Sequence, residues 1–170
     1  MPVREILLLG NPVLYERCAR VRPDEADGLR PVVRDLHDTL MDFRARRGVG
    51  RAIAAPQIGL TKRLVYMHID APAVFVNPVL DEMSAETFEL WDDCMSFPDL
   101  LVRVVRHRSC RITYRDLDWN EHQHVLHDDL SELLQHECDH LDGILAVARA
   151  VGPRAFALRG ERGNPSGGGS

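Results

Sequence analysis

The alternation of hydrophobic and polar positions changes its period along this chain, and each change marks a different kind of element. Between residues 23 and 43 the apolar positions recur at the i, i+3, i+4, i+7 spacing of an amphipathic helix. Asp24 or Asp27 would cap its start, and the basic run that ends at Gly48 would end it. The apolar stripe consists of Leu29, Val32, Val33, Leu36, Leu40 and Phe43.

The middle of the chain has the shorter apolar runs that are typical of β-strands. Polar turns separate these runs, and the turn over residues 116–120 would join the last two into a hairpin. The glycine-rich stretch 48–59 stands before the first run and has the small residues that allow close approach of two backbones. The predicted strands cover residues 63–69, 73–76, 87–91, 101–105, 110–114 and 122–126.

A second helix is predicted late in the chain, from about residue 130 to 141. Asp128 or Asp129 would cap it and Gly143 would end it. Short strands followed by a late helix predict an α+β fold in which antiparallel sheets pack around this C-terminal helix. We expect one catalytic domain over residues 1–150. Residues 151–170 lose the periodicity and become rich in Gly and Ser, so we expect a flexible tail there.

Composition and charge narrow the class of protein. The 170 residues, 45% hydrophobic and 28% charged, suffice for one domain with a proper core. A formal net charge of -5 does not support a nucleic-acid partner. No apolar run is long enough to span a membrane, and the short apolar start is not typical of a signal peptide. The four cysteines form no C-x-x-C pair, which indicates reduced thiols in a cytoplasmic protein.

The segment 133–141 of the predicted C-terminal helix contains the pattern H-E-x-x-H. His136 and His140 lie one turn apart on one helix face, so their imidazoles can converge on one metal ion. Glu137 lies about 100° around the helix, where it can act as a general base without binding the metal. An ordinary surface helix rich in His and Glu is the simpler alternative.

Two histidines leave a hydrolytic metal site one protein ligand short. The extended protease pattern would place a histidine at position 146, but the chain has Ala146 there. Glu161 is the one acid that remains downstream, and it lies in a loose glycine-containing segment. We therefore expect the third ligand upstream, and a protease becomes a weaker hypothesis.

Three blocks of sequence occur together in a recognisable order. Residues 54–57 read A-A-P-Q, residues 94–96 read C-M-S, and residues 135–143 read Q-H-E-C-D-H-L-D-G. This combination resembles the peptide deformylase family, whose three signatures are G-x-G-L-A-A-P-Q, E-G-C-L-S and Q-H-E-x-D-H-L. The resemblance extends over roughly residues 5 to 145.

The resemblance implies a metal site formed by Cys94, His136 and His140. These residues would bind ferrous iron, which zinc, nickel or cobalt can replace, because thiolate and imidazole suit all four metals. Glu137 would act as the general base in hydrolysis of an N-formyl amide. The side chain of Gln57 and the backbone N–H of Met95 would stabilise the negative charge on the formyl oxygen.

The resemblance also implies a substrate, the formyl-methionyl end of a nascent chain or peptide, bound along a strand edge by main-chain hydrogen bonds. Formate and a free amine are the products. Nothing in the sequence indicates a membrane partner or an oligomeric state. The residues that would line the substrate site are Gly50, Ala52, Ile53, Asp93 and Leu133.

Several positions depart from the family pattern. Without a gap, Arg51 stands where a small aliphatic residue is usual and Ala52 replaces the second glycine, whereas a two-residue insertion would preserve the glycines of residues 48–50. Both alignments stay open. In the second block Asp92 replaces a glutamate, and Asp93 adds a carboxylate where the family has glycine.

Two further acids, Asp129 and Glu132, precede the metal motif. The family usually has an apolar residue at position 129, in the pocket for the methionine side chain. An unpaired buried carboxylate against a thioether would be costly, so the substrate side chain would be polar or basic rather than methionine. In the alternative interpretation the segment shifts and both acids are solvated.

Three functions remain possible: a peptide deformylase, a hydrolase of another formamide, and a silent relative that only binds protein N-termini. Retention of Glu137, Gln57 and the three ligands argues against the silent binder, because binding requires no general base. His122 and His124 alternate on a predicted strand, where an exposed strand face explains them better than a second metal pair.

Overall fold

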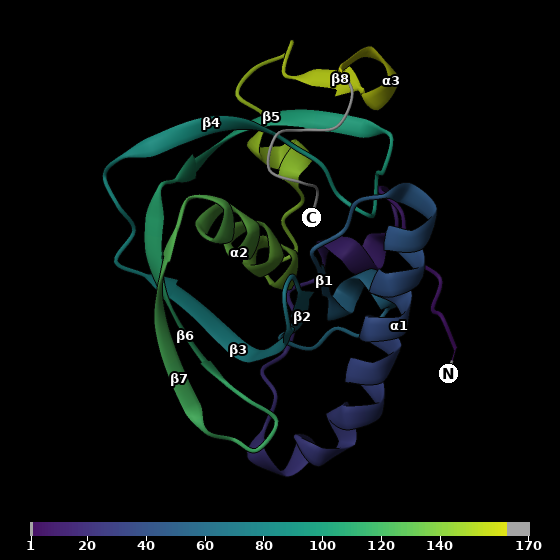
Figure 1. Cartoon of the computed structure of the whole chain (residues 1–170), viewed down its shortest axis with the longest axis vertical. Helices are drawn as coiled ribbons and strands as arrows, with labels where there is room; N and C mark the ends of the chain where they lie inside the picture. Colours follow the sequence, from purple (N-terminus) through teal and green to yellow (C-terminus); the bar gives the residue numbers. More distant parts are fainter. Residues whose placement is uncertain (1, 163–170) are drawn as a thin grey trace.

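Two antiparallel sheets and a long helix surround the second helix of the chain. The structure, a computed structural model, describes residues 2–162. The larger sheet has the strand order β1-β2-β3-β6-β7 and the smaller one the order β4-β5-β8. Helix α2 (Asp128–Leu141) lies between them, and α1 (Arg30–Arg47) stands at the side of β1 and β2 (Figure 1). This arrangement confirms the predicted α+β fold.

All six predicted strands are present close to their predicted positions, and the structure has two more. The turn at residues 116–120 joins β6 and β7 as predicted. Strands β1 and β8 were not predicted. The strands are β1 Ala52–Ala54, β2 Leu64–His68, β3 Pro72–Asp81, β4 Thr87–Asp92, β5 Leu100–His107, β6 Ser109–Arg115, β7 Glu121–His127 and β8 Phe156–Leu158.

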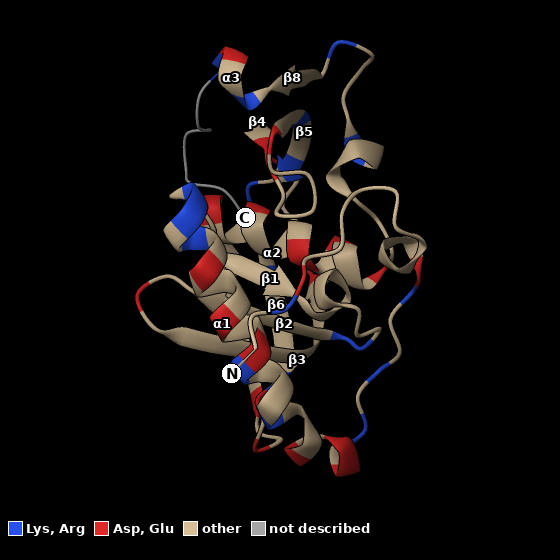
Figure 2. Ribbon diagram, turned by 90° about the vertical axis from the view of Figure 1, so that its right-hand side faces the viewer, with Lys and Arg blue, Asp and Glu red and all other residues tan. Residues whose placement is uncertain are grey.

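Helix α1 begins later than its hydrophobic period suggested. Residues 23–29 form two short 3-10 turns, and the helix starts at Arg30. The predicted caps are wrong: Asp24 and Asp27 pair instead with nearby arginine side chains, and no side chain caps α1. Its end is as predicted, because Gly48 adopts φ 73°, the left-handed conformation that closes a helix. Arginines gather at this C-terminal end, where they complement the helix dipole (Figure 2).

Strand β1 occupies the stretch of small residues after Gly48. It is an edge strand that pairs antiparallel with β2, with Ile53 opposite Tyr66. Three residues are too few to show a period, so the sequence could not identify this strand. Ile53 and Tyr66 join the apolar stripe of α1 in one core cluster.

Strand β8 corrects the expectation of a loose segment after residue 150. Phe156 pairs with Val102 of β5, and the short helix α3 (Arg159–Arg162) follows directly. Residues 156–162 thus form a strand and a short helix, which the loss of periodicity did not predict. The rest of the predicted tail, residues 163–170, lies outside the described residues.

Helix α2 is buried on every side after its first turn, although more than half of its residues are polar. Its start is not capped as predicted, because His127 is the capping residue and makes no side-chain bond there. It ends before Gly143, which has φ 73°. A Cβ at Gly143 would lie 2.4 Å from the carbonyl oxygen of Tyr15, so only glycine fits. Buried polar residues need partners, and those of α2 lead to the site described next.

No helix in the described part of the chain has the length and apolar character required to cross a bilayer.

Candidate metal centre

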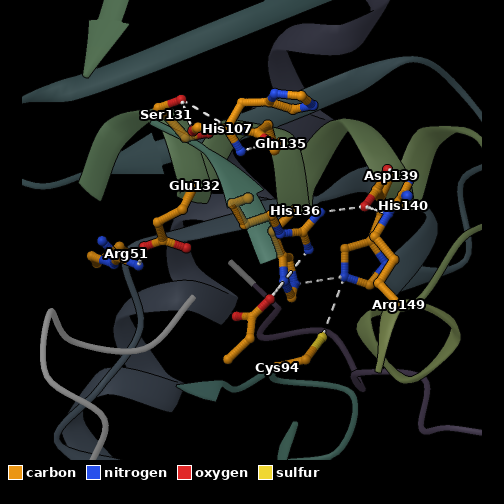
Figure 3. Close-up of polar contacts among 12 residues, drawn as sticks. Arg51, Cys94, His107, Ser131, Glu132, Gln135, His136, Asp139, His140 and Arg149 are labelled. Atoms are coloured by element: carbon orange, nitrogen blue, oxygen red, sulfur yellow. Dashed lines mark hydrogen bonds and ion pairs between the residues drawn. The ribbon is translucent and has the colours of Figure 1, made fainter. Parts of the chain in front are cut away.

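Three potential metal ligands meet below the middle of α2. The two ring nitrogens Nε2 of His136 and His140 lie 3.2 Å apart, and the Sγ atom of Cys94 lies 3.3 Å from His140 Nε2. All three side chains are buried, and their ligand atoms lie within 4.8 Å of one another. Cys94 lies in the loop that follows β4, so this loop supplies the sulfur and a helix supplies both imidazoles (Figure 3). The two histidines lie on a helix, as the sequence pattern predicted.

The spacing of these donor atoms suits a divalent metal. Bonds of about 2.0–2.3 Å in a tetrahedral arrangement put ligand atoms about 3.3–3.7 Å apart. Burial, followed by the charge of His136, lowers the pKa of His140 well below its usual value, so this ring is neutral, as a metal ligand must be.

Burial and neighbouring groups have opposite effects on the pKa values of the other two ligands, His136 and Cys94. Burial lowers the pKa of His136, but the charge and hydrogen bond of Asp92 outweigh it and raise the pKa well above its usual value. Burial raises the pKa of the Cys94 thiol, although its hydrogen bond to His136 opposes this. A metal would have to displace these protons, so its binding is coupled to their release.

The side chain of Gln57 also contacts the sulfur of Cys94. It lies on a short 3-10 helix, Ala55–Ile58, directly after β1. Its side-chain oxygen accepts a hydrogen bond from the backbone N–H of Ala54 at 2.9 Å. The amide nitrogen is thereby turned toward Ser96 Oγ at 3.2 Å and Cys94 Sγ at 3.5 Å. This fixed N–H donor can stabilise negative charge that develops beside the ligand cluster.

Glu137 is the buried acid next to the ligands. One of its carboxylate oxygens, Oε2, has no hydrogen-bond partner in the described part of the chain. Burial is the main reason that its pKa rises, to about 7, although the charge of His136 opposes the rise. A carboxyl group that titrates near neutrality can both accept and return a proton.

Asp92, which stands where the family pattern has glutamate, still accepts a hydrogen bond from His136. Asp92 Oδ2 accepts a hydrogen bond from His136 Nδ1 at 2.8 Å and contacts Arg106 Nη2 at 3.3 Å. Burial would raise the pKa of Asp92, but these two partners lower it to about 2. Arg106 also donates to Asp139 at 2.6 Å, and Asp139 accepts two further bonds from Arg149. This network fixes the ring orientation of a predicted ligand.

The sequence analysis missed Arg106, Asp139 and Arg149. One signal was present: Arg106 and Arg103 stand among the apolar residues of this strand, and a charge that such a strand buries needs a partner. Asp139 is the fourth residue of the H-E-x-x-H pattern, where it attracted no separate attention.

The added carboxylate Asp93 has a partner in the C-terminal segment. It is buried, and it accepts a hydrogen bond from Arg159 Nη2 at 2.5 Å. Arg159 also donates to the carbonyl oxygen of Pro98 at 2.9 Å. The structure therefore places Asp93 in an ion pair that ties α3 to the loop of Cys94.

The other expected substrate residues lie around β1 and α2. Gly50 has φ 132° and its carbonyl oxygen accepts a hydrogen bond from Arg44. Ala52 and Leu133 are buried. Ile53 is also buried, and it packs with Met95 in the core cluster under α1. Since strand side chains alternate between faces, Ile53 points to the opposite face of β1 from Ala52.

The two acids before the metal motif behave differently. Asp129 is exposed, which contradicts its expected place in a buried pocket. Glu132 is 3% exposed, which contradicts the alternative in which both acids are solvated. Its Oε1 atom accepts a hydrogen bond from Arg51 Nη2 at 2.6 Å.

His122 and His124 lie on β7. His122 Nε2 is 2.7 Å from Asp116 Oδ2, and the ring of His122 stacks with that of His124. Within residues 2–162, the cluster of Cys94, His136 and His140 is the one group of three that could hold a metal ion. The interpretation of His122 and His124 as an ordinary strand face is consistent with this arrangement.

Comparison with known proteins gives one consistent result. The family model described as polypeptide deformylase matches residues 3–155. Peptide deformylase 1 of Prochlorococcus marinus is 37% identical, over 95% of this chain and 88% of its own. The peptide deformylase of Leptospira biflexa is 33% identical over 92% of both chains.

Solved structures agree with these sequences. The crystal structure of peptide deformylase from Thermotoga maritima superposes with a TM-score of 0.82 at 27% identity, over 89% of this chain and 100% of that one. A peptide deformylase from Synechococcus elongatus, in complex with actinonin, has a TM-score of 0.82 at 29% identity and covers 90% of this chain and 81% of its own.

Proposed function

The chain belongs to the polypeptide deformylase family, and on this premise we propose that it hydrolyses the formyl group from the N-terminus of formylated peptides. Water and an N-formyl amide react to give formate and a free amine. The family consists of metal-dependent hydrolases. The observation that carries the proposal is the buried cluster of Cys94, His136 and His140 with the carboxyl group of Glu137 beside it.

Cys94, His136 and His140 would hold the metal, for which we propose ferrous iron, with zinc, nickel or cobalt as substitutes. One thiolate and two imidazoles suit all of these ions, and three protein ligands leave a coordination position for solvent or substrate. When bound, such an ion makes hydroxide available near neutral pH and polarises a carbonyl group. Asp92 keeps His136 oriented for this role through its bond to Nδ1.

Glu137 would accept a proton from the attacking water and deliver it to the nitrogen of the leaving amine. Its pKa of about 7 suits both steps, because the group changes its protonation state with little cost near neutrality. The amide N–H of Gln57 and the backbone N–H of Met95 would stabilise the charge on the formyl oxygen. Loss of one such donor typically lowers turnover by about 10² to 10³.

The peptide would lie in extended form beside β1, whose free edge can offer main-chain hydrogen bonds to an added strand. N-formylated chains arise where proteins are synthesised, so we infer that the enzyme works in the cytoplasm on nascent chains and on free formyl peptides.

The test is release of formate from formyl peptides by iron-loaded protein. Glu137→Gln should lower kcat by about 10² or more, because it removes the proton acceptor and keeps the shape of the side chain. Glu121→Gln, the same change at an exposed position of β7, should leave kcat unchanged. Failure to release formate from any formyl peptide, or full activity in Glu137→Gln, would overturn the proposal.

A further inference from the structure

A buried ion pair stands beside the metal centre and takes no part in the proposed chemistry. Glu132 of α2 and Arg51, the residue before β1, are joined at 2.6 Å. The side chain of Glu132 is almost fully buried, and its second oxygen, Oε2, has no hydrogen-bond partner among the described residues. A buried carboxylate oxygen without a donor is unfavourable, so a ligand that brings one would gain from it.

The pair lies where a substrate side chain would reach. Glu132 precedes His136 by four residues, so both side chains project from the same face of α2, about 6 Å apart along its axis (Figure 3). Arg51 opens the segment that runs through β1 to Gln57, the proposed donor to the formyl oxygen.

The geometry of a formyl peptide matches this distance. The first Cα atom is two bonds from the formyl carbon, and a side chain of four or five atoms extends about 5–6 Å from it, roughly one helical turn. The tip of such a side chain would come to the unpartnered oxygen of Glu132. An apolar or thioether tip would leave that oxygen unsatisfied, whereas an N–H or O–H group would pair with it.

We propose that Arg51 and Glu132 select the first side chain of the substrate, and that this site prefers formyl peptides whose first residue carries a hydrogen-bond donor at its end over formyl-methionyl peptides. The inference rests on the proposed function and gives it a substrate class. Arg51 holds one oxygen of Glu132 in place, and the other oxygen receives the donor of the substrate.

The first experiment compares kcat/KM for four tripeptides that share the sequence Ala-Ser after a formylated Lys, Gln, Met or norleucine. Norleucine has the same chain length as methionine without its sulfur. We expect the Lys and Gln peptides to be about tenfold or more better substrates than the other two, because a site built to hydrogen-bond a group discriminates strongly against its absence. An equal or higher value for the Met peptide in the wild-type protein would overturn the inference.

Two variants test the assignment to these residues. Glu132→Gln, which keeps the shape and removes the charge, should lower the Lys preference by about tenfold. Replacing the pair by Arg51→Met with Glu132→Leu should reverse the order in favour of Met and norleucine. Asp129→Asn is the matched control, since it makes the same chemical change at an exposed position of α2 and should leave all ratios unchanged. Thermal unfolding of each metal-loaded variant shows that it has folded.

Binding provides a readout that is independent of turnover. In the Glu137→Gln background, calorimetric dissociation constants for the same formyl peptides should follow the same order, and Glu132→Gln should remove the difference. If the protein deformylates all four peptides but prefers Met, and the variants do not change this preference, the inference is refuted and the proposed function is retained. Absence of activity on every peptide would refute the proposed function itself.

Discussion

Asp139 and Glu132 are two buried acids on the same helix, and their surroundings are opposite. Asp139 accepts three hydrogen bonds, one from Arg106 and two from Arg149. Glu132 accepts one, from Arg51, and one of its oxygens has no partner within the described residues. The first acid is held in a closed network, whereas the second keeps an unused acceptor next to the proposed reaction centre.

The difference indicates two uses of buried charge. A network in which a carboxylate has all its partners fixes geometry, and here it extends from Asp139 through Arg106 and Asp92 to His136. A carboxylate with one partner gains little for the fold and remains available to a ligand. Substitutions at Asp139 should therefore affect stability and metal binding, and substitutions at Glu132 should affect substrate choice.

The largest expected effect concerns stability. Asp139→Asn should lower the free energy of unfolding by about 3–5 kcal/mol, because it breaks the buried ion pair with Arg106 and the ion pair with Arg149, and leaves Arg106 with Asp92 alone as its acidic partner. Glu132→Gln, the equivalent change, should cost less than about 1 kcal/mol, since it also removes an unsatisfied charged oxygen. Urea denaturation of the metal-free proteins measures both. Equal losses in the two variants would show that the distinction between the two acids is wrong.

The second effect concerns metal affinity. Asp92→Asn should weaken metal binding by about 10–100-fold, because His136 loses the acceptor that orients its ring. Glu132→Gln should leave the affinity unchanged. Competition with a chromophoric chelator provides the dissociation constants.

Removal of the metal should lower the stability of the wild-type protein as well. A metal at 100 times its dissociation constant stabilises a folded protein by about 2.7 kcal/mol. Cys94→Ser should lose most of this increment and Cys110→Ser, a buried thiol outside the ligand cluster, should keep it. An increment that survives in Cys94→Ser would exclude the sulfur as a ligand.

The smallest effect is a dependence on pH. Burial raises the pKa of Glu132 above its ordinary value of 4.5, although Arg51 opposes the rise. The folded protein then holds this proton more tightly than the unfolded chain. The associated stability is fully present below pH 4.5 and declines as the pH rises through the folded-state pKa.

Wild-type protein should therefore lose free energy of unfolding relative to Glu132→Gln as the pH increases from 4.5, in metal-free samples. Comparison with this variant cancels the contribution of other groups, including Glu137. Denaturation curves at a series of pH values measure the difference. A constant difference, or one that favours the wild-type protein at higher pH, would contradict the burial of a singly partnered carboxylate.

Local patterns predicted six of the eight strands, both longer helices and two of the three proposed metal ligands. Short apolar runs between polar turns predicted strands β2 to β7, and the H-E-x-x-H spacing placed two imidazoles on one face of a helix. The third ligand came from the resemblance to a family, because no local pattern connects Cys94 with residues more than 40 positions later. The predicted helix caps failed since neighbouring arginines compete for the same carboxylates.

The ion pairs around the site could not be predicted for a different reason. Arg51 and Glu132 are 81 residues apart, and Arg159 and Asp93 are 66 residues apart. Which charges meet in the interior depends on how the two sheets close around α2. Arg51, Asp93 and Glu132 therefore looked like departures from a family pattern, whereas the structure shows each of them with a partner.

The tight contact of Gly143 with Tyr15 has a consequence for how the protein is made. The end of α2 is joined to the first twenty residues there, and the N–H of Cys18 also bonds the carbonyl oxygen of Leu141 at 2.9 Å. During translation, more than a hundred further residues must be synthesised before residues 15–18 can make these contacts with the end of α2. Such distant contacts form slowly. Capture of the metal ion should thus be among the last events of folding.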